Sequence, residues 1–413
     1  MIHLIILLLT IFLISEISCV NPGILDKNVI SIKVQSVLNQ PTVYINNISE
    51  PYFSKIGLYL DGVMLPNFDK KVPVSDGKIH KIVLIFPKNF EENCQNMFSG
   101  IKIIKEINFI NFKGCNNTKE MFYNMDNLTD LVLDQFDTSL VTNMNKMFAG
   151  CTSLTSLDLR NFNTSRVADM SWMFASLTSL SYFQNLNKLN TSRVNDMSNL
   201  FALCSNLKSI DLSGFDTRRV LHMGEMFYGC SSLVSLDLSK FNTKYVVFMT
   251  KMFYGDISLT SLNLSSFDTS RVKFMNCMFE NCNSLTSVDV SSFNTESVID
   301  MEFMFANCNL TKIDLKNFNT SRVERMFGMF LYNEYLTSLD LSSFRTDKLE
   351  TVAFLVSGCS SLTSIDLYNF DFEKIKSQNN MFHKSDNLKY VRNSKCIFGY
   401  LGRKYPNFTC IKN

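Results

Sequence analysis

Aspartates that recur at one position of a 26-residue repeat form one of the longest rows of identical polar side chains in the chain. The column comprises Asp158, Asp211, Asp237, Asp289, Asp314, Asp340 and Asp366. Carboxylates stacked about 4.8 Å apart on the concave face of a sheet would repel one another. The column should therefore attract cations, basic segments or hydroxyl-rich ligands. A repeated, hydrogen-bonded face that keeps the protein soluble is the alternative interpretation.

Two aromatic residues share a second repeat position. Trp172, the only tryptophan, and Phe303 lie far from the apolar side of the helix that we expect there. They predict exposed rings on the convex surface that could anchor an interface, although packing against an adjoining helix is the alternative. A basic column could face anions or glycans, or pair with the aspartates. It contains Arg166, Arg193, Arg219, Arg271 and Arg322.

The sequence offers little for catalysis. Of the four histidines, His3 belongs to the leader, and His80, His222 and His383 stand alone, without a metal-binding or nucleophile motif around them. The net charge of +2 gives no reason to expect a nucleic-acid partner. We therefore expect no enzyme activity, no metal and no cofactor.

The cysteines fall into classes once the repeat is aligned. A first class occupies a slot where Leu177 also occurs, which predicts small buried side chains with free thiols, although neighbouring rungs could pair two of them. It consists of Cys151, Cys204, Cys230, Cys282, Cys308 and Cys359. Disulfide candidates lie in the irregular ends of the chain, where Cys94 accompanies Cys115 and Cys396 accompanies Cys410. Cys277 falls on the outward side of the expected helix, which predicts an exposed, unpaired thiol.

A repeat must position all of these residues. Its Met-Phe marker, or a close substitute, returns from Met97 to Met381 at intervals of 24 to 27 residues. A fixed period of this size over roughly 300 residues indicates stacked rungs that share one core. Phe241 should close the inner core of its rung.

Two apolar periods alternate inside each unit. Leu154, Leu157 and Leu159 fit a short strand with one buried face. Upstream, Val141, Met144, Met147, Phe148 and Cys151 fit one face of a helix. Asn/Asp-Thr pairs resemble N-caps of that helix, and Gly150 with its counterparts resembles a C-cap. We therefore expect an α/β fold, a leucine-rich-repeat solenoid with a parallel β-sheet on one face and short helices on the other.

The expected domain order begins with a signal peptide at residues 1–19, because an apolar run precedes small residues. A lipid anchor at Cys19 is an alternative, but Glu16 stands where a bacterial lipobox has Leu. Residues 20–93 alternate like a small β domain or N-terminal cap. The solenoid of about twelve rungs follows at residues 94–393, and residues 394–413 form a C-terminal cap. We expect no transmembrane segment in the mature chain.

The repeat motif Met-Phe-x-x-Cys-x-Ser-Leu-Thr-Ser-Leu-Asp-Leu-Ser-x-Phe-Asn-Thr resembles the repeat of the BspA-like leucine-rich surface proteins, including the mycoplasma lipoprotein repeat family. The resemblance covers about residues 94 to 393 and implies extracellular display, adhesion, and binding to host or matrix proteins.

Sequons fit a secretory route, although those at Asn163, Asn190 and Asn319 occupy a repeat position that structure alone could explain. The remaining glycosylation candidates are Asn47, Asn116, Asn127, Asn263, Asn309 and Asn407. The sequence thus predicts a secreted or cell-surface protein that binds an extracellular protein or glycan. A self-associating coat or wall component is the alternative.

Overall fold

The computed structural model describes residues 27–36, 43–44, 55–66, 71–88, 90–396 and 409–412. The chain divides into two compact units, Met1–Arg193 and Val194–Asn413, which we call unit 1 and unit 2. The expected signal peptide, Cys19, Asn47 and Asn407 lie outside the described residues. No helix in the described part of the chain is long and apolar enough to cross a membrane.

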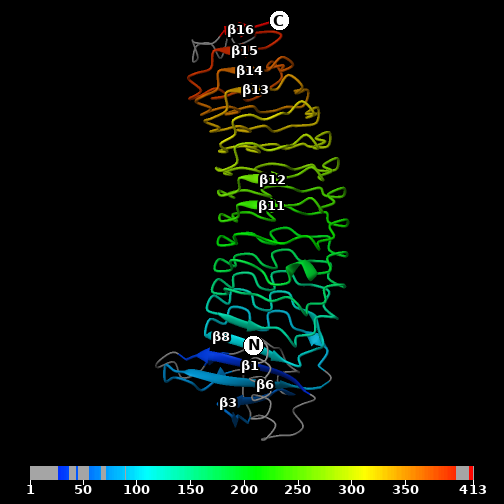
Figure 1. Cartoon of the computed structure of the whole chain (residues 1–413), viewed down its shortest axis with the longest axis vertical. Helices are drawn as coiled ribbons and strands as arrows, with labels where there is room; N and C mark the ends of the chain where they lie inside the picture. The colour runs from blue at the N-terminus through cyan, green and yellow to red at the C-terminus, as the bar shows by residue number, and fades with distance from the viewer. Residues whose placement is uncertain are drawn as a thin grey trace. The chain divides into compact units, whose positions relative to one another are not determined.

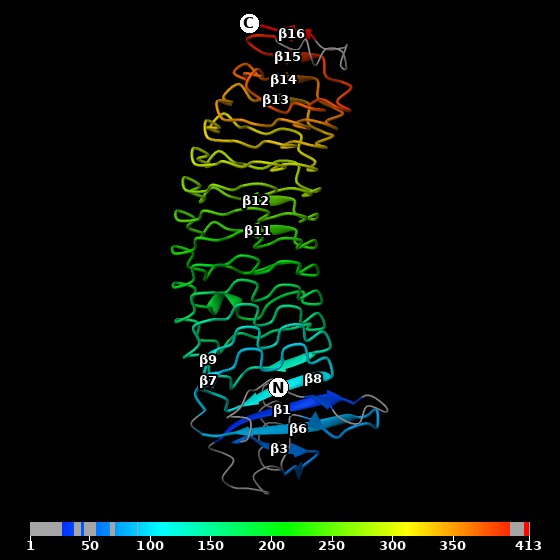
Figure 2. The same ribbon diagram turned by 180° about the vertical axis from the view of Figure 1, so that it is seen from behind.

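Unit 1 begins with a six-stranded sheet whose order is β10-β8-β1-β6-β3-β4. Its strands are β1 (Asn28–Gln35), β3 (Gly57–Leu60), β4 (Val63–Met64), β6 (Ile79–Phe86), β8 (Ile104–Ile110) and β10 (Asp130–Val132). β8 pairs antiparallel with β1 on one side and parallel with β10 on the other. The antiparallel N-terminal sheet and the first repeats therefore share a strand, as Figure 1 and Figure 2 show.

Two small sheets accompany the large one. β2 (Val43–Tyr44) pairs antiparallel with β5 (Lys71–Val72). β7 (Glu92–Asn93) pairs parallel with β9 (Cys115–Asn117), and the disulfide Cys94–Cys115 links the ends of this pair.

Unit 2 is a stack of coils with parallel strands. β11 (Ser235–Asp237) pairs with β12 (Ser261–Asn263), and β13 (Ser338–Asp340), β14 (Ser364–Asp366), β15 (Tyr390–Arg392) and β16 (Thr409–Ile411) form a second sheet. Ser235 aligns with Ser261, and Ser338 aligns with Ser364, so the register shifts by one 26-residue repeat per coil. The same parallel stacking is visible in Figure 2.

The expected helices are absent from the described residues, in which helical structure is limited to 3₁₀ turns such as η3 (Leu186–Lys188). In an α-helix the amide of Phe148 would donate to the carbonyl four residues earlier. It donates instead to the carbonyl of Met173 in the next coil, at 3.0 Å. The prediction of an α/β leucine-rich-repeat solenoid is therefore wrong, and the repeats in both units form β-solenoid coils.

Successive β-turns occupy the stretch that we expected to be helical. The amide of Met147 donates to the carbonyl of Met144, and that of Cys151 to Phe148. The third residue of each turn is left-handed, with φ of 55° at Lys146 and 77° at Gly150. Gly150 therefore closes a turn rather than a helix. Turns that advance three residues bury side chains at nearly the helical spacing, which explains the wrong assignment.

The Asn/Asp-Thr pairs also serve a different purpose from the expected N-cap. The Oδ1 of Asn163 accepts the amide of Ser165 at 3.1 Å, which forms an Asx-turn. Thr164 is buried, and its hydroxyl donates to the carbonyl of Asn190 in the next coil at 2.9 Å. The threonine thus joins neighbouring coils through the interior.

Uniform columns of apolar side chains fill the core. In unit 2 the phenylalanine rings of one column stack on their neighbours, with centroids 5.3 to 5.9 Å apart. They belong to Phe201, Phe227, Phe253, Phe279, Phe305 and Phe330. Phe241, in a second column, is 2% exposed where the strand ends. Each coil buries its rings against the coils above and below, so its stability depends on its neighbours.

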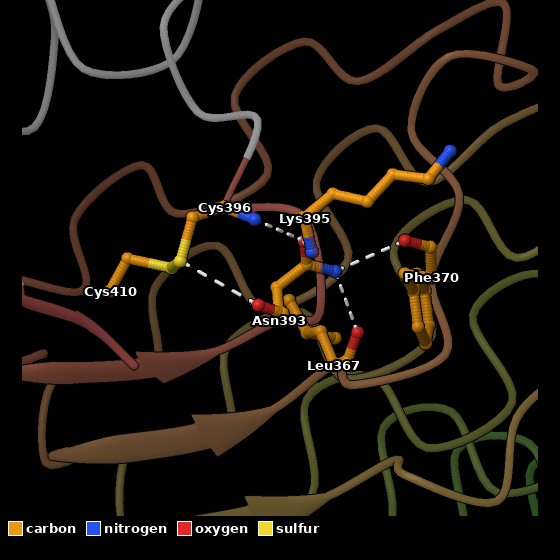
Figure 3. The surroundings of a disulfide bond; sticks show 6 residues. All are labelled: Leu367, Phe370, Asn393, Lys395, Cys396 and Cys410. Carbon is orange, nitrogen blue, oxygen red and sulfur yellow. Dashed lines mark hydrogen bonds between the residues drawn. A yellow bond between two sulfur atoms is a disulfide. The ribbon is translucent and has the colours of Figure 1, made fainter. Parts of the chain in front are cut away.

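The last coil of unit 2 is closed by a polar side chain and a disulfide (Figure 3). Asn393 occupies the repeat position of Leu367, and its Nδ2 donates to the carbonyls of Leu367 at 2.9 Å and Phe370 at 3.0 Å. Its Oδ1 accepts the amide of Cys396 at 2.9 Å, and Cys396 is bonded to Cys410 in β16. A buried amide therefore satisfies carbonyls at the point where the regular repeat ends.

Candidate functional site

The aspartate column lies on the strand face, with Asp158 in unit 1 and the other members in unit 2. Each Oδ1 accepts the amide of the residue two positions later, at 2.9 to 3.1 Å. Asp158 and Asp366 are half-buried, and the remaining aspartates are exposed. One carboxylate oxygen of every member is thus engaged in a turn, and the second oxygens of Asp158, Asp314 and Asp366 also pair with basic side chains.

Hydrogen bonds, rather than mutual repulsion, dominate the electrostatics of this column. The amide of Ser239 lowers the pKa of Asp237, and the hydroxyl and amide of Ser291 lower the pKa of Asp289. Asp314 raises the pKa of Asp289 by a smaller amount. Asp237 and Asp289 therefore remain ionised at neutral pH.

Arginines and an asparagine interrupt the column. Arg160 pairs with Asp158, and Arg392 Nη1 pairs with Asp366 Oδ2 at 2.8 Å. Asn263 takes the aspartate position in β12. Among the described residues, no three His, Cys, Asp or Glu side chains are placed to hold a metal ion together.

Trp172 and Phe303 do share one repeat position, but that position is the left-handed residue of a turn, with φ of 60° and 55°. Both side chains are half-buried. In unit 1 the Nζ of Lys146 lies 5.9 Å from the Trp172 ring. In unit 2 the Phe303 ring lies over Gly328 and 5.1 Å from the Phe327 ring. Neither residue projects from a helix, and part of each ring remains accessible.

A row of stacked rings in unit 2, formed by His222, Phe248 and Phe274, was not singled out from the sequence. These residues pair as parallel β-bridges in successive coils, and we call them the aromatic row. Ring centroids are 4.8 Å apart for His222 and Phe248 and 5.1 Å apart for Phe248 and Phe274. All three side chains are half-buried. The shared repeat position of the three residues could be read from the sequence, because each stands four positions before a repeat marker. We overlooked it because we had assigned this stretch to a helix.

Two further aromatic groups lie in unit 2. Phe303, Phe327 and Phe354 form a tilted cluster with centroids 5.1 and 5.3 Å apart. Tyr228 and Tyr254 stack at 5.0 Å. Other coils place Thr, Asn or Gly at several of these positions, so the backbone does not require large rings there.

The basic column is solvent-exposed, including Arg219, Arg271 and Arg322 in unit 2. The guanidinium of Arg271 lies 4.7 Å from the centroid of the Tyr245 ring. In the part of the chain that the structure describes, these three arginines form no ion pair with the aspartate column. The pairing between arginines and aspartates that the sequence offered as an alternative is therefore not seen for these three arginines of unit 2.

The cysteines separate into bonded and buried groups. The structure joins Cys94 to Cys115 and Cys396 to Cys410, the pairs that the sequence singled out. The cysteines of the repeat slot are buried and form no disulfide, and burial raises the pKa of Cys151 to about 12. Such thiols are unreactive. Cys277, expected to be exposed, is also buried, because its position belongs to a turn that packs against the neighbouring coils.

The histidines occupy separate parts of the fold. In unit 1, His80 lies between two carboxylates, with Nδ1 2.8 Å from Asp61 and Nε2 2.8 Å from Asp76. His222 belongs to the aromatic row, and the backbone carbonyl of His383 accepts the amide of Gly358. Of the sequon asparagines, Asn116, Asn127 and Asn263 are exposed and Asn309 is half-buried.

One protein family matches the repeats. The family described as "Mycoplasma protein of unknown function, DUF285" matches residues 92–210, 195–311 and 283–394, which together cover most of the chain. No curated protein sequence matches the chain significantly.

Proposed function

The chain belongs to the family of Mycoplasma proteins of unknown function DUF285, and on that premise we propose that it is an extracellular binding or adhesion protein. In this proposal the repeats form a scaffold that presents side chains to host, matrix or glycan ligands. The resemblance of the repeat motif to BspA-like surface proteins supports the same function and a secreted or cell-surface location.

The observation that carries the proposal is the contrast between buried and outward columns in unit 2. Buried columns repeat the same residue types from coil to coil, because neighbouring coils must pack on one another. Some outward columns vary, whereas the aspartate column varies little. At one varied position Phe248 and Phe274 are followed in the next two coils by Asp300 and Arg325, which pair with each other. Partly exposed rings that the fold does not require are typical of binding surfaces.

Two disulfides support an oxidising, extracellular environment. Cys94–Cys115 and Cys396–Cys410 lie near the two ends of the repeats. Disulfides are rare in a reducing cytosol and common in secreted proteins. The apolar leader expected from the sequence agrees with this interpretation.

A binding screen of the full secreted chain against matrix proteins, glycans and intact cells tests the proposal. We expect saturable binding to at least one of these ligand classes by a monomeric protein. Loss of this binding in Phe248→Ala combined with Phe274→Ala would point to the aromatic row. Loss in Asp211→Asn, Asp237→Asn and Asp289→Asn together would point to the strand face.

Two results would contradict the proposal. Light scattering that showed ordered self-assembly without any foreign ligand would favour the coat or wall component. An absence of binding by a chain whose melting curve is cooperative would also count against a binding function.

A further inference from the structure

Cationic side chains follow the buried threonines Thr217, Thr243 and Thr269 in three successive coils of unit 2. The chain turns sharply after each threonine, as the hydrogen bond from the amide of Val220 to the carbonyl of Thr217 at 3.0 Å illustrates. The residues at these turns point into solvent, and we call them the basic corner. They are Arg218, Arg219, Lys244, Tyr245 and Arg271.

Most of the positive charge of the basic corner is not neutralised by the protein. Arg218 pairs with Asp216, with Nη2 and Oδ2 2.6 Å apart. Arg219, Lys244 and Arg271 are exposed and form no ion pair among the described residues. Coils in a parallel stack lie about 4.8 Å apart. Arg219 and Arg271 share one repeat position two coils apart, and Lys244 stands one position earlier in the coil between them, so the three cations lie close together. An anionic partner would relieve the repulsion between them.

Two carboxylates near the corner are already engaged in turns. The Oδ1 of Asp268 accepts both the amide of Ser270 at 3.0 Å and its hydroxyl at 2.6 Å. Lys244 and Arg271 lower the pKa of Asp268 from a distance, after the larger effect of Ser270. Asp216 also accepts the amide of Arg218 at 3.1 Å. These two carboxylates reduce the positive charge of the corner without cancelling it.

The aromatic row lies beside the basic corner in the same coils. His222, Phe248 and Phe274 each follow a corner residue by three positions. Their rings stack with interplanar angles of 17° and 4°, so Phe248 lies between two rings, and His222 and Phe274 each turn one face toward it. Ring edges carry the positive end of the aromatic quadrupole. The exposed part of the row therefore favours anionic groups, as the corner does.

We propose that the basic corner and the aromatic row together bind a linear anionic glycan that carries sulfate or carboxylate groups at regular intervals. The proposal rests on the proposed extracellular binding function and names its ligand class. A repeated row of cations suits a polymer with repeated anions. Single-stranded nucleic acids also carry such anions, but they stack their bases on open ring faces, and the ring faces that meet inside the row are occupied by each other. The next coil places Glu296 at the corner, which limits the site to three coils.

Heparin is the probe, and its affinity for the full secreted chain is measured at several salt concentrations. The test variant combines Arg219→Gln, Lys244→Gln and Arg271→Gln. The control removes two cations where the test variant removes three: it combines Arg322→Gln and Lys348→Gln, exposed cations at the repeat position of Arg219 and Arg271 but outside the three coils. We expect the test variant to lose at least about tenfold in affinity and most of the salt dependence, because each released contact lowers the salt slope. The control should change by less than about twofold on the same scale.

A second variant separates the rings from the charges. Phe248→Leu with Phe274→Leu should weaken heparin binding while leaving the salt slope unchanged, since no cation is lost. Melting curves of all variants show whether the fold is intact. If the triple variant melts early, the single variant Arg219→Gln is measured against Arg322→Gln instead.

Three results would overturn the proposal: no heparin binding by the wild-type chain, an equal loss in test and control variants, or tighter binding to single-stranded DNA of equal charge. In the last case the corner would be a nucleic-acid surface. The failure of this proposal can be told apart from the failure of the proposed function. If the wild-type chain does not bind heparin but the triple variant still binds matrix proteins or cells, the glycan site is refuted and the adhesion function is not.

Discussion

Asp256 is a buried carboxyl in the middle of the cysteine slot of unit 2, and replacing it should stabilise the protein. Its side chain is 0% exposed. Its Oδ1 accepts the amide of Cys230 at 2.8 Å, and its Oδ2 has no hydrogen-bond partner. Burial raises the pKa of Asp256 well above the ordinary range.

Other residues of this slot donate a hydrogen bond to the preceding coil. The thiol of Cys282 donates to the carbonyl of Phe253 at 3.0 Å, and the amide of Asn333 donates to Phe305 at 2.7 Å. An ionised Asp256 cannot donate at all. The slot thus favours a protonated carboxyl, which is consistent with the raised pKa.

The pH dependence follows from the linkage between protonation and folding. In the unfolded chain the carboxyl titrates near its usual pKa of about 3.9, whereas the folded state retains the proton. Stability therefore falls as the pH rises above that value, until the folded pKa is reached. Each pH unit lowers the free energy of unfolding by about 1.4 kcal/mol at most, so the loss of stability between pH 4 and pH 7 is at most about 4 kcal/mol.

Asp256→Asn keeps the acceptor for Cys230, supplies the missing donor and cannot ionise. We expect its free energy of unfolding to exceed that of the wild type by an amount that grows from pH 5 to pH 7, measured by urea unfolding. Asp256→Cys, the residue that most other coils use, should act in the same direction. Asp289→Asn is the control, because hydrogen bonds lower the pKa of Asp289 and its removal cannot produce this gain. Parallel stability curves for wild type and Asp256→Asn would refute the reasoning.

Three further predictions test the core, the threonine bonds and the N-terminal sheet. Phe241→Ala should destabilise unit 2 by about 3 to 5 kcal/mol in urea unfolding, because a 2% exposed ring leaves a cavity; a loss under about 1 kcal/mol would contradict its core position. Thr217→Val should lower the free energy of unfolding by about 1 to 3 kcal/mol, because the Thr217 hydroxyl donates to the carbonyl of Asn242 and accepts the amide of Asn242. An unchanged melting curve would disprove this role of the hydroxyl. Hydrogen bonds to Asp61 and Asp76 raise the pKa of His80, so its stabilising effect should be complete below about pH 6.5 and disappear as the pH rises through the folded pKa. In His80→Gln this loss should be absent from the protection of the β6 amides against hydrogen exchange, once the measured rates are corrected for the pH dependence of intrinsic exchange. A loss of corrected protection that persists in His80→Gln would exclude the histidine.

The candidate surfaces were only partly accessible from the sequence. The repeat alignment placed Asp237 and its counterparts in one outward column, and that column exists on the strand face. The same alignment left the aromatic row unnoticed, because Phe248 and Phe274 were assigned to a helix. Cys277 was misplaced for the same reason: an outward helical position became a buried turn.

The sequence by itself determined the period, the buried columns and the stacking of the coils. Apolar residues at fixed positions of a 26-residue repeat can be buried only if identical units stack in register. Local spacing could not decide the backbone conformation, because turns and helices both bury residues three or four apart. That choice depends on where the amide of Phe148 finds its partner, and the partner is Met173 in the next coil. Only the stacking of the coils in the tertiary structure brings that carbonyl within hydrogen-bonding distance. The same stacking produces the β-solenoid coils and the rows of side chains on their surface.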